Sequence, residues 1–439
     1  MIKKPISPIA FYLALSLSLV GYILLGYFTE RTNFTQLITL FGLLFFGYFY
    51  LASANLNENF IKQGITFSIL FRLSLLFMLP NLSDDYFRFV WDGRLSVHGI
   101  NPFVVMPSSF IDSDQAISTG LNRDLFSSMN SQGYYTIYPP VLQFIFWVSA
   151  QLFPSNILGS VIVMRSFIIA TEIGSVFLLF AILKKLKLPS KNILLYVLNP
   201  LVIVELSGNL HFEALMIFFL LFSVYLLLNE QFVFSAIVFS FAICSKLLPL
   251  MFLPLLPKQI GMKKSMVFYS ICGVTTLLLF IPYIDEQFVS NISSSINLYF
   301  QTFEFNASIF YVVRWAGFKT LGYDVIGTAG TILSAIAMLA ILSISFFQKE
   351  KVSLFKAMLY CITIYFAFAT IVHPWYISTL VVLSVFTSLR YPLIWSALIV
   401  LTYFTYRSIP YLENLLIVTI EYAILTIFFI YEWKRKRVV

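Results

Sequence analysis

The chain has 439 residues, of which 59% are hydrophobic and only 11% are charged. This composition leaves too little polar surface for a water-soluble globule, so it indicates a membrane protein that crosses the bilayer many times. The net charge of +8 would favour nucleic acid in a soluble protein, but here the basic residues gather in short loops and at the C-terminus, so we expect no nucleic-acid partner.

Apolar runs that are long enough to cross a bilayer follow one another along the chain. The first comes directly after Lys3-Lys4 and lacks a small-residue cleavage site, so we expect it to remain as a transmembrane helix. We expect an all-α bundle of about 12–14 transmembrane helices in a single integral membrane domain, 1–439, surrounded by membrane lipid. A run at 232–256 is interrupted by a lysine and two prolines, so it is either a broken helix or a short hairpin. The other runs lie at 9–28, 36–55, 64–80, 157–181, 192–207, 211–229, 265–283, 323–347, 353–371, 376–389, 391–408 and 413–433.

Basic clusters orient these helices, because lysine and arginine are retained on the cytoplasmic side. With every cluster inside, the first three runs carry the chain from a cytoplasmic N-terminus to the outer face at Asn81. The apolar run 141–153 is too short to span and is bounded by prolines, so we interpret it as an interfacial helix on the outer surface. The segment from about 81 to 156 is therefore a long outer loop, and it contains six aspartates. The clusters lie at 3–4, 184–187, 258–264, 349–351 and 434–437.

The outer loop begins with two adjacent carboxylates. The sequence SDDYFRFVWDGRLSVHGINPF, residues 83–103, places Asp84 and Asp85 just after a predicted span. Two aspartates at the C-terminal end of a helix would oppose the helix dipole, which favours cations there. We therefore favour a function for this pair.

A helix over 85–92 would put Asp85, Arg88 and Asp92 on one stripe, with aromatic side chains at headgroup level. This pattern indicates a carboxylate that acts as a general base and an arginine that holds its geometry, with Arg88 or Arg94 as the partner cation. A solvated, ion-paired loop helix is the alternative interpretation, and its ion pairs would contribute little stability.

Further ionisable residues lie at the ends of spans or within them, where a charge is costly and indicates a site or a pathway. GNLHFEA, residues 208–214, joins two runs and carries His211 and Glu213, although a plain hairpin loop could hold both. Lys246 in the motif SKLLP lies within an apolar run, so it must either find an anion or extend to the membrane interface.

The tetrapeptide HPWY, residues 373–376, ends one run and begins another. A proline that starts a helix and aromatic rings at the interface explain most of it structurally. His373 has no such explanation and is a candidate phosphate contact. Arg314 and Arg407, near the outer ends of runs, are further candidates, with extension to the interface as the alternative.

Several common site signatures are missing from the sequence. It has no Gly-rich phosphate loop, no paired Cys/His metal spacing and no nucleophile elbow. Cys244, Cys272 and Cys361 all fall in apolar runs, so we expect them to be small core residues. Nucleotide-driven transport and zinc-dependent hydrolysis are therefore unsupported.

Five motifs, in this order along the chain, resemble those of the bacterial polyprenol-phosphate-dependent mannosyltransferases of the GT-C superfamily. They are SDDYFRFVWDGRLSVHGINPF, YPP at 138–140, GNLHFEA, SKLLP and HPWY. The protein O-mannosyltransferases and the lipid A aminoarabinose transferase are similar at a greater distance. The chain departs from the pattern in one respect, because GT-C enzymes often place the acidic loop after the first span and here it follows the third.

The resemblance implies a GT-C fold in the bacterial cytoplasmic membrane, with an active site that faces the periplasm. It also implies a hexose, mannose in these relatives, that is carried on a polyprenyl phosphate and passed to a glycan or lipid acceptor. The family's catalytic aspartate corresponds to Asp85, although Asp84 stays open as the base.

This chemistry needs a base for the acceptor hydroxyl and cations for the departing phosphate. Direct displacement would invert the anomeric carbon. No cofactor is expected, and a divalent metal is possible but not required. The candidate residues for substrate or phosphate binding are Arg88, Asp92, Arg94, Asn101, His211, Glu213, Lys246, His373, Tyr376 and Arg407.

Two alternatives to a mannosyltransferase remain. A transporter or flippase of lipid-linked sugar would use ionisable residues in the membrane, such as Lys246 and Glu205, as its path. We find no internal repeat that would favour a transporter, and the acidic residues gather in the outer loop rather than in the helices. An O-antigen ligase or polymerase would differ in using a donor that carries a sugar chain.

Overall fold

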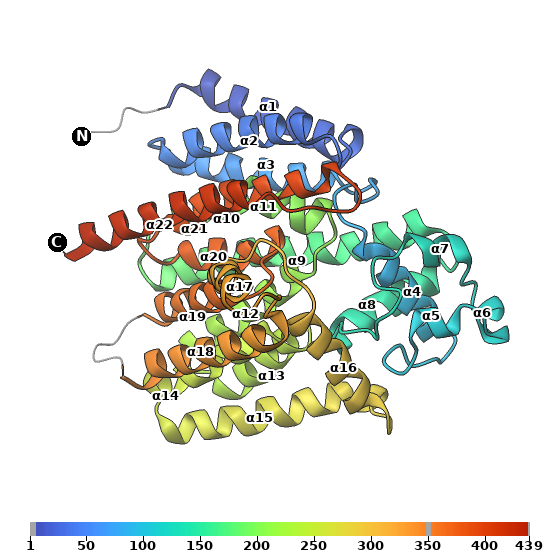
Figure 1. Cartoon of the computed structure of the whole chain (residues 1–439). Helices are drawn as coiled ribbons and strands as arrows, with labels where there is room; N and C mark the ends of the chain where they lie inside the picture. The colour runs from blue at the N-terminus through green and yellow to red at the C-terminus, as the bar shows by residue number, and fades with distance from the viewer. Residues whose placement is uncertain (1–5, 348–352, 438–439) are drawn as a thin grey trace.

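The computed structural model of the chain describes residues 6–347 and 353–437. Within these residues the chain forms helices and no β-strand, which confirms the predicted all-α class. The basic clusters at 3–4 and 349–351 lie outside the described residues. The long helices run side by side in one bundle, and a group of short helices projects from one end of it (Figure 1).

Six helices in the described part of the chain are long and apolar enough to cross a membrane, and a bent pair is a seventh candidate. The chain is therefore a multi-pass membrane protein. The bent pair is formed by 190–197 and 200–208, which meet at 51° where Pro200 begins a new helix. The six are α1 (Pro8–Phe28), α2 (Phe34–Ser53), α9 (Ile157–Lys185), α15 (Met262–Phe280), α18 (Ile326–Phe347) and α22 (Leu415–Arg437).

The other predicted spans are also helical, but their helices are shorter than the roughly 20 residues that cross a bilayer. They include α3 (Glu58–Ser74), α12 (Glu213–Leu228), α13 (Phe232–Ile243) and α19 (Leu354–Phe368). Short segments complete the bundle: η1 (Ser190–Ile193), α10 (Leu194–Val197), α11 (Pro200–Val202), η2 (Ile203–Gly208), η4 (Ile281–Tyr283), α16 (Phe288–Gln301), α17 (Ile309–Thr320), η5 (Pro374–Tyr376), α20 (Ile377–Ser384), α21 (Tyr391–Leu398) and η6 (Ile399–Arg407).

The run 232–256 is a broken helix, which decides between the two alternatives that its sequence allows. Helix α13 ends at Ile243, residues 244–247 are irregular, and η3 (Leu248–Leu255) and α14 (Leu256–Ile260) follow. Helix α13 packs between α12 and α15. The break therefore exposes Lys246 at the end of a helix rather than along its side.

The projecting group of helices, residues 85–152, is here named the outer unit. It consists of α4 (Asp85–Val97), α5 (Pro107–Phe110), α6 (Asp114–Ser118), α7 (Arg123–Ser128) and α8 (Pro140–Leu152). The start of α1 and the end of α22 lie at the opposite end of the bundle (Figure 1). Helix α8 has only 13 residues, as expected for the run 141–153, and it packs against α4 and α9.

Close packing of α4 on α8 fixes the orientation of the outer unit. The ring of Phe89 stacks on that of Phe146, with centroids 4.8 Å apart. Gly93 faces the α8 backbone, and a Cβ atom added there would lie 2.4 Å from the carbonyl oxygen of Phe146. Real Cβ atoms do not approach an oxygen so closely, so only glycine permits this separation of the two helices.

A buried arginine of α9 joins the segment before α4 to the end of η2. The guanidinium of Arg165 donates hydrogen bonds to the carbonyls of Leu76 (2.8 Å) and Met78 (2.5 Å), before α4, and to those of Ser207 (2.7 Å) and Gly208 (2.9 Å), at the end of η2. A buried cation is tolerated when carbonyl oxygens satisfy its donors. Arg165 therefore positions the aspartate loop and the GNLHFEA loop relative to each other.

Candidate active site

The two aspartates begin a helix. Helix α3 ends at Ser74, Asp84 is the N-cap of α4, and Asp85 is the first residue of α4. The prediction that the pair ends a transmembrane helix is therefore wrong, and the dipole of α4 stabilises both charges instead of opposing them. The position of the pair no longer argues for a function, so that argument must rest on the surroundings of each carboxylate.

Asp85 lies in a partly buried position, where it accepts a hydrogen bond of 2.9 Å from Nδ2 of Asn130. Burial raises the pKa of Asp85 above its ordinary value, and the hydrogen bond from Asn130 opposes this rise. Asp84 and Glu213 raise the pKa further, whereas Lys246 lowers it. The carboxylate of Asp85 thus interacts electrostatically with Glu213, at the start of α12, and with Lys246, in the break after α13.

Asp84 has a separate partner. Its Oδ2 is 2.7 Å from Nη2 of Arg31, which comes from the loop between α1 and α2. The same guanidinium lies 4.6 Å from the ring centroid of Tyr406 and donates to the hydroxyl of Tyr411 at 3.0 Å. This ion pair occupies Asp84, whereas Asp85 accepts only a neutral amide hydrogen bond. Of the two, Asp85 is the carboxylate that fits a proton acceptor.

Lys246 finds an anion, which is one of the two outcomes that its position in an apolar run allows. Its ammonium pairs with the carboxylate of Glu213, the first residue of α12, and lies 4.3 Å from the ring centroid of Tyr376. The side chain is 34% exposed, so the cation is accessible to a ligand. Three of the candidate residues therefore come together in one place.

Two imidazoles stack on the indole of Trp375 beside this lysine. The ring centroid of His211 is 3.7 Å from that of Trp375, and the centroid of His373 is 4.3 Å from it. Burial, with a further contribution from Lys246, lowers the pKa of His373 to about 3, and the same causes lower that of His211. Both imidazoles are therefore neutral at pH 7. Nδ1 of His373 is buried without a hydrogen-bond partner, so it can still bind a ligand, whereas Nε2 of His211 faces Glu205.

Glu205 lies behind His211 on the π-helical segment η2. Its carboxylate accepts hydrogen bonds from the hydroxyl of Tyr403 (2.5 Å) and from Nδ2 of Asn209 (3.1 Å), and its Oε2 is 3.5 Å from Nε2 of His211. The side chain is fully buried. These contacts hold the GNLHFEA loop and orient His211. They also satisfy the buried carboxylate with hydrogen-bond donors, which indicates a structural role for Glu205.

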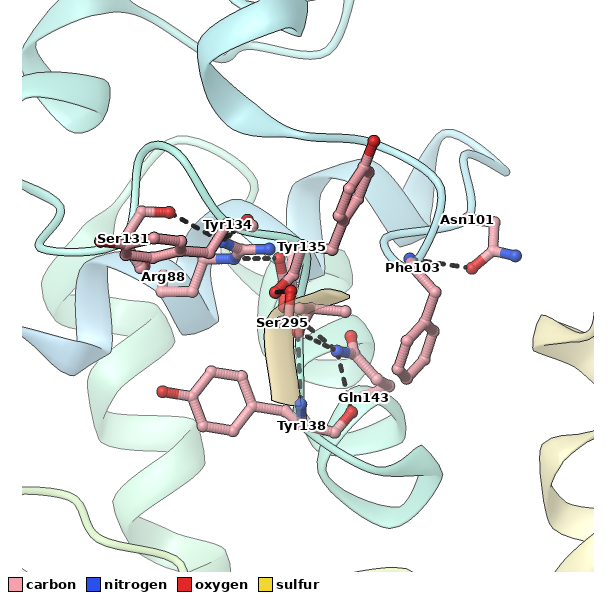
Figure 2. A network of polar contacts seen from close by, with 11 residues as sticks. Arg88, Asn101, Phe103, Ser131, Tyr134, Tyr135, Tyr138, Gln143 and Ser295 are labelled. Carbon is pink, nitrogen blue, oxygen red and sulfur yellow. Dashed lines mark hydrogen bonds and ion pairs between the residues drawn. The ribbon is translucent and has the colours of Figure 1, made fainter. Parts of the chain in front are cut away.

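Arg88 does not hold Asp85, in contrast to the predicted stripe. Its Nε donates to Asp92 at 2.7 Å, and its Nη1 donates to the carbonyls of Ser131 (3.1 Å) and Tyr134 (2.8 Å) (Figure 2). Both Arg88 and Asp92 are buried. Arg88 and Asp92 form an i, i+4 ion pair within α4. In this orientation the guanidinium also donates hydrogen bonds to the two loop carbonyls, which would otherwise lack donors.

The other hydrogen bonds of this network stabilise the loop that precedes α8. Asp92 also accepts hydrogen bonds from Thr136 (2.5 Å) and Gln143 (3.1 Å), and Nε2 of Gln143 also lies 3.3 Å from the carbonyl of Tyr138 (Figure 2). Tyr138 packs edge-on against Phe89, at 5.0 Å between centroids. The structure therefore gives Arg88 and Asp92 the role of supporting residues.

Three other candidates lie apart from this cluster. Asn101 donates to the carbonyl of Tyr283 at 2.9 Å and accepts from the amide of Phe103, so it holds a loop. Arg407 is exposed, with its guanidinium 4.6 Å from the ring centroid of Phe404. Arg94, the other partner predicted for Asp85, donates to the carbonyl of Gly120 at 2.8 Å and lines a different cavity.

Arg314 pairs with Glu304. Cys244, Cys272 and Cys361 are buried free thiols, as predicted. No group of three or more His, Cys, Asp or Glu side chains in the described part of the chain could hold a metal ion.

Four residues of the cluster are absent from the predicted set: Arg31, Asn130, Trp375 and Tyr406. The sequence does carry a signal for Arg31. On the predicted topology it lies outside the membrane after the first span, against the rule that retains arginine inside. Asn130 has no such signal, because it comes from an irregular loop and reaches Asp85 only through the fold.

One family model matches the chain over residues 15–259, and its description is alpha-(1->6)-mannopyranosyltransferase, N-terminal domain, of the MptA_B family. The match covers more than half of the 439 residues. The chain belongs to this family. The protein is therefore a mannosyltransferase, and so a glycosyltransferase. No curated protein matches the chain.

In this mannosyltransferase the family match includes the aspartate pair, the outer unit and Lys246. It ends before the aromatic residues Trp375, Tyr376 and Tyr406. The cluster thus combines two parts of the chain. The carboxylates and Lys246 lie in the matched part, and these three aromatic residues lie beyond it.

Proposed function

We propose that this enzyme has a GT-C type mechanism, in which mannose passes from a polyprenyl-phosphate donor to the hydroxyl of a glycan or lipid acceptor on the outer face of a bacterial cytoplasmic membrane. The observation that carries the proposal is the juxtaposition of Asp85 with Lys246 and its neutral imidazoles at one end of the bundle. A proton acceptor and a cation close together suit a transfer from phosphate to a hydroxyl.

Asp85 is the proposed general base. Its raised pKa makes the carboxylate a stronger proton acceptor than an exposed aspartate. In the reaction the acceptor oxygen attacks the anomeric carbon, the bond from that carbon to the phosphate oxygen breaks, and Asp85 takes the hydroxyl proton. The electron pair of the broken bond stays on the departing polyprenyl phosphate.

Lys246 is the proposed phosphate ligand. Its present partner is Glu213, and its partial exposure lets a phosphate approach the ammonium from the open side. The neutral imidazole of His373 can donate a hydrogen bond to a phosphate oxygen without adding charge. These donors stabilise the negative charge that develops as the leaving group departs.

The stereochemistry follows from a single displacement. The family description specifies an α-(1→6) linkage, so the acceptor hydroxyl is a 6-hydroxyl and the product is an α-mannoside. One displacement at the anomeric carbon inverts its configuration, and an α product then requires a β-linked donor.

A transfer assay with purified enzyme tests this proposal. We expect transfer from β-mannosyl polyprenyl phosphate and none from the α anomer or from a nucleotide-linked mannose. Asp85→Asn should lower kcat by about 100-fold or more, because a general base commonly contributes 10²–10⁴-fold. Asp84→Asn should retain more activity than Asp85→Asn, since Asp84 is already paired with Arg31.

Three results would contradict parts of the proposal. Use of the nucleotide-linked sugar would reject the lipid donor. An inactive Asp84→Asn beside a fully active Asp85→Asn would move the base by one residue. Full activity in both variants would remove this pair from the chemistry.

A further inference from the structure

A cavity lies between the outer unit and the start of α9, on the side of α4 that faces α7. Its volume is about 340 Å³, which is within the range of about 300–1,000 Å³ that ligand pockets occupy. Its lining includes Phe87 and Arg94 of α4, Asp124 and Ser128 of α7, and Ile157 of α9. None of these residues belongs to the aspartate and lysine cluster described above.

Arg94 gives this cavity an unused hydrogen-bond donor. The residue is only 5% exposed, its Nη1 donates to the carbonyl of Gly120, and its Nε is buried without a hydrogen-bond partner. A buried donor without a partner costs free energy, so a ligand oxygen in the cavity would relieve that cost.

The remaining lining suits a neutral polyhydroxyl ligand. Asp124 supplies acceptors, Asn122 supplies an amide, Arg94 supplies donors, and the ring of Phe87 supplies an apolar face. A sugar presents hydroxyls that both donate and accept, together with C–H faces that pack on an aromatic ring. An anionic ligand would be attracted by Arg94 but repelled by Asp124.

Two residues that line the cavity are close in sequence to the site of Asp85. Phe87 follows Asp85 by two residues, so the two side chains leave opposite sides of the first turn of α4. Asn130, which donates to Asp85, follows Ser128 by two residues, so their Cα atoms are at most about 7 Å apart. The cavity therefore begins within one helical turn of Asp85, close to the N-terminal end of α4.

We propose that this cavity binds the acceptor, an α-(1→6)-linked mannooligosaccharide, and presents its terminal 6-hydroxyl to Asp85. The proposal rests on the proposed function for the role of Asp85 and on the family's linkage for the sugar. Phe87 and Arg94 lie seven residues apart on one stripe of α4, about 10 Å along the axis, so the cavity follows the helix and suits an elongated ligand.

Two adjacent serines of α7 allow a matched test. The hydroxyls of Ser127 and Ser128 both donate to the carbonyl of Asp124, at 3.1 and 2.8 Å, and both residues are exposed, but only Ser128 lines the cavity. Ser128→Trp would fill the cavity, and Ser127→Trp would place the same ring outside it. Asp124→Asn would remove a charge from the lining without changing its volume.

The measurement is calorimetric titration of the full-length enzyme with α-(1→6)-mannotriose in the absence of donor. We expect the wild type and Ser127→Trp to bind alike, Ser128→Trp to bind at least 10-fold more weakly, and Asp124→Asn to bind several-fold more weakly. In the transfer assay, Ser128→Trp should raise the acceptor KM and leave the donor KM unchanged.

Equal affinity in the two tryptophan variants together with full affinity in Asp124→Asn would overturn the proposal. So would the absence of mannotriose binding to the wild type. Because the titration contains no donor, its result is independent of donor identity. Binding that depends on Ser128, in an enzyme that does not use a polyprenyl-phosphate donor, would reject the proposed function and keep the acceptor site.

Discussion

At the scale of single residues, the hydrogen bond from Asn130 tunes the basicity of Asp85. Burial favours the neutral carboxylic acid, and a hydrogen bond to the carboxylate favours the charged form. A base that must be ionised before it accepts a proton loses activity as the pH falls through its pKa. With Asp85 as the proposed base, we therefore expect the amide to extend the active pH range on the acid side.

Asn130→Ala should raise the pKa of Asp85 further, because it removes an interaction that lowers this pKa. The acid limb of the kcat/KM profile should then move to higher pH, since the carboxylate is protonated earlier as the pH falls. Gln132→Ala is the control, because Gln132 lies in the same loop but donates to the carbonyl of Phe126. An acid limb that stays in place or moves to lower pH would contradict the pairing of Asn130 with the base.

Lys246 offers a second test at this scale. Lys246→Met removes the cation and leaves Glu213 without its partner, so kcat/KM for the donor should fall by about 100-fold or more. Lys264→Met is a close control, because Nζ of Lys264 also lies 4.3 Å from a ring centroid, that of Phe232. Equal donor kinetics in the two variants would exclude Lys246 as the phosphate ligand.

At the scale of helices, the contact between α4 and α8 determines where the aspartates lie. Gly93→Ala would press a methyl group into the backbone of Phe146, and backbone cannot move aside as a side chain can. Overpacking of this kind costs about 1–3 kcal/mol, so we expect a lower thermal midpoint in detergent and reduced transfer. Gly133→Ala, in the same outer unit, meets nothing within 4 Å and should behave like the wild type. Similar midpoints for the two variants would show that the helices can separate without penalty.

The sequence predicts the helices well but not where each one ends. The apolar run continues from α3 through Leu75 to Leu79, so hydropathy alone places the aspartates at the end of a span, whereas the hydrogen-bonded helix stops at Ser74. An apolar run reports the solvent around a segment and not the path of its backbone. The predicted short helix over 141–153 is confirmed, because α8 has only 13 residues. Its position at the membrane interface stays a prediction.

The site could be predicted only in part. Sequence motifs identify Asp85, Glu213, Lys246 and His373, because each is a costly charge or an unexplained polar group in an apolar chain. They do not identify Asn130, whose position depends on the tertiary fold. Spacing along a helix likewise allows Arg88 to reach either aspartate, and the distant loop carbonyls decide between them.

At the scale of the whole molecule, the outer unit lies at one end of the bundle, and the start of α1 and the end of α22 lie at the other (Figure 1). On the proposed topology Gly133→Cys should therefore react with a membrane-impermeant maleimide in intact cells, and Lys434→Cys only after permeabilisation. The three native cysteines are buried, so background labelling should be low. The reverse pattern of labelling would place the aspartates on the cytoplasmic face.

The lengths of α12 and α13 set the depth of the active site. At 1.5 Å per residue these helices of 16 and 12 residues are about 24 and 18 Å long, against about 30 Å of hydrocarbon. Their connecting turn is anchored at the far end, where Asn229 accepts a hydrogen bond from Lys185 of α9 at 2.7 Å. On the proposed topology, with Asn229 at the opposite headgroup level, we therefore expect Glu213 and Lys246 to lie several ångströms below the outer headgroups. The phosphate of a lipid donor would then have to move below the headgroup level to reach these residues. We therefore expect the transfer rate to be highest in thin bilayers, where this displacement is smallest.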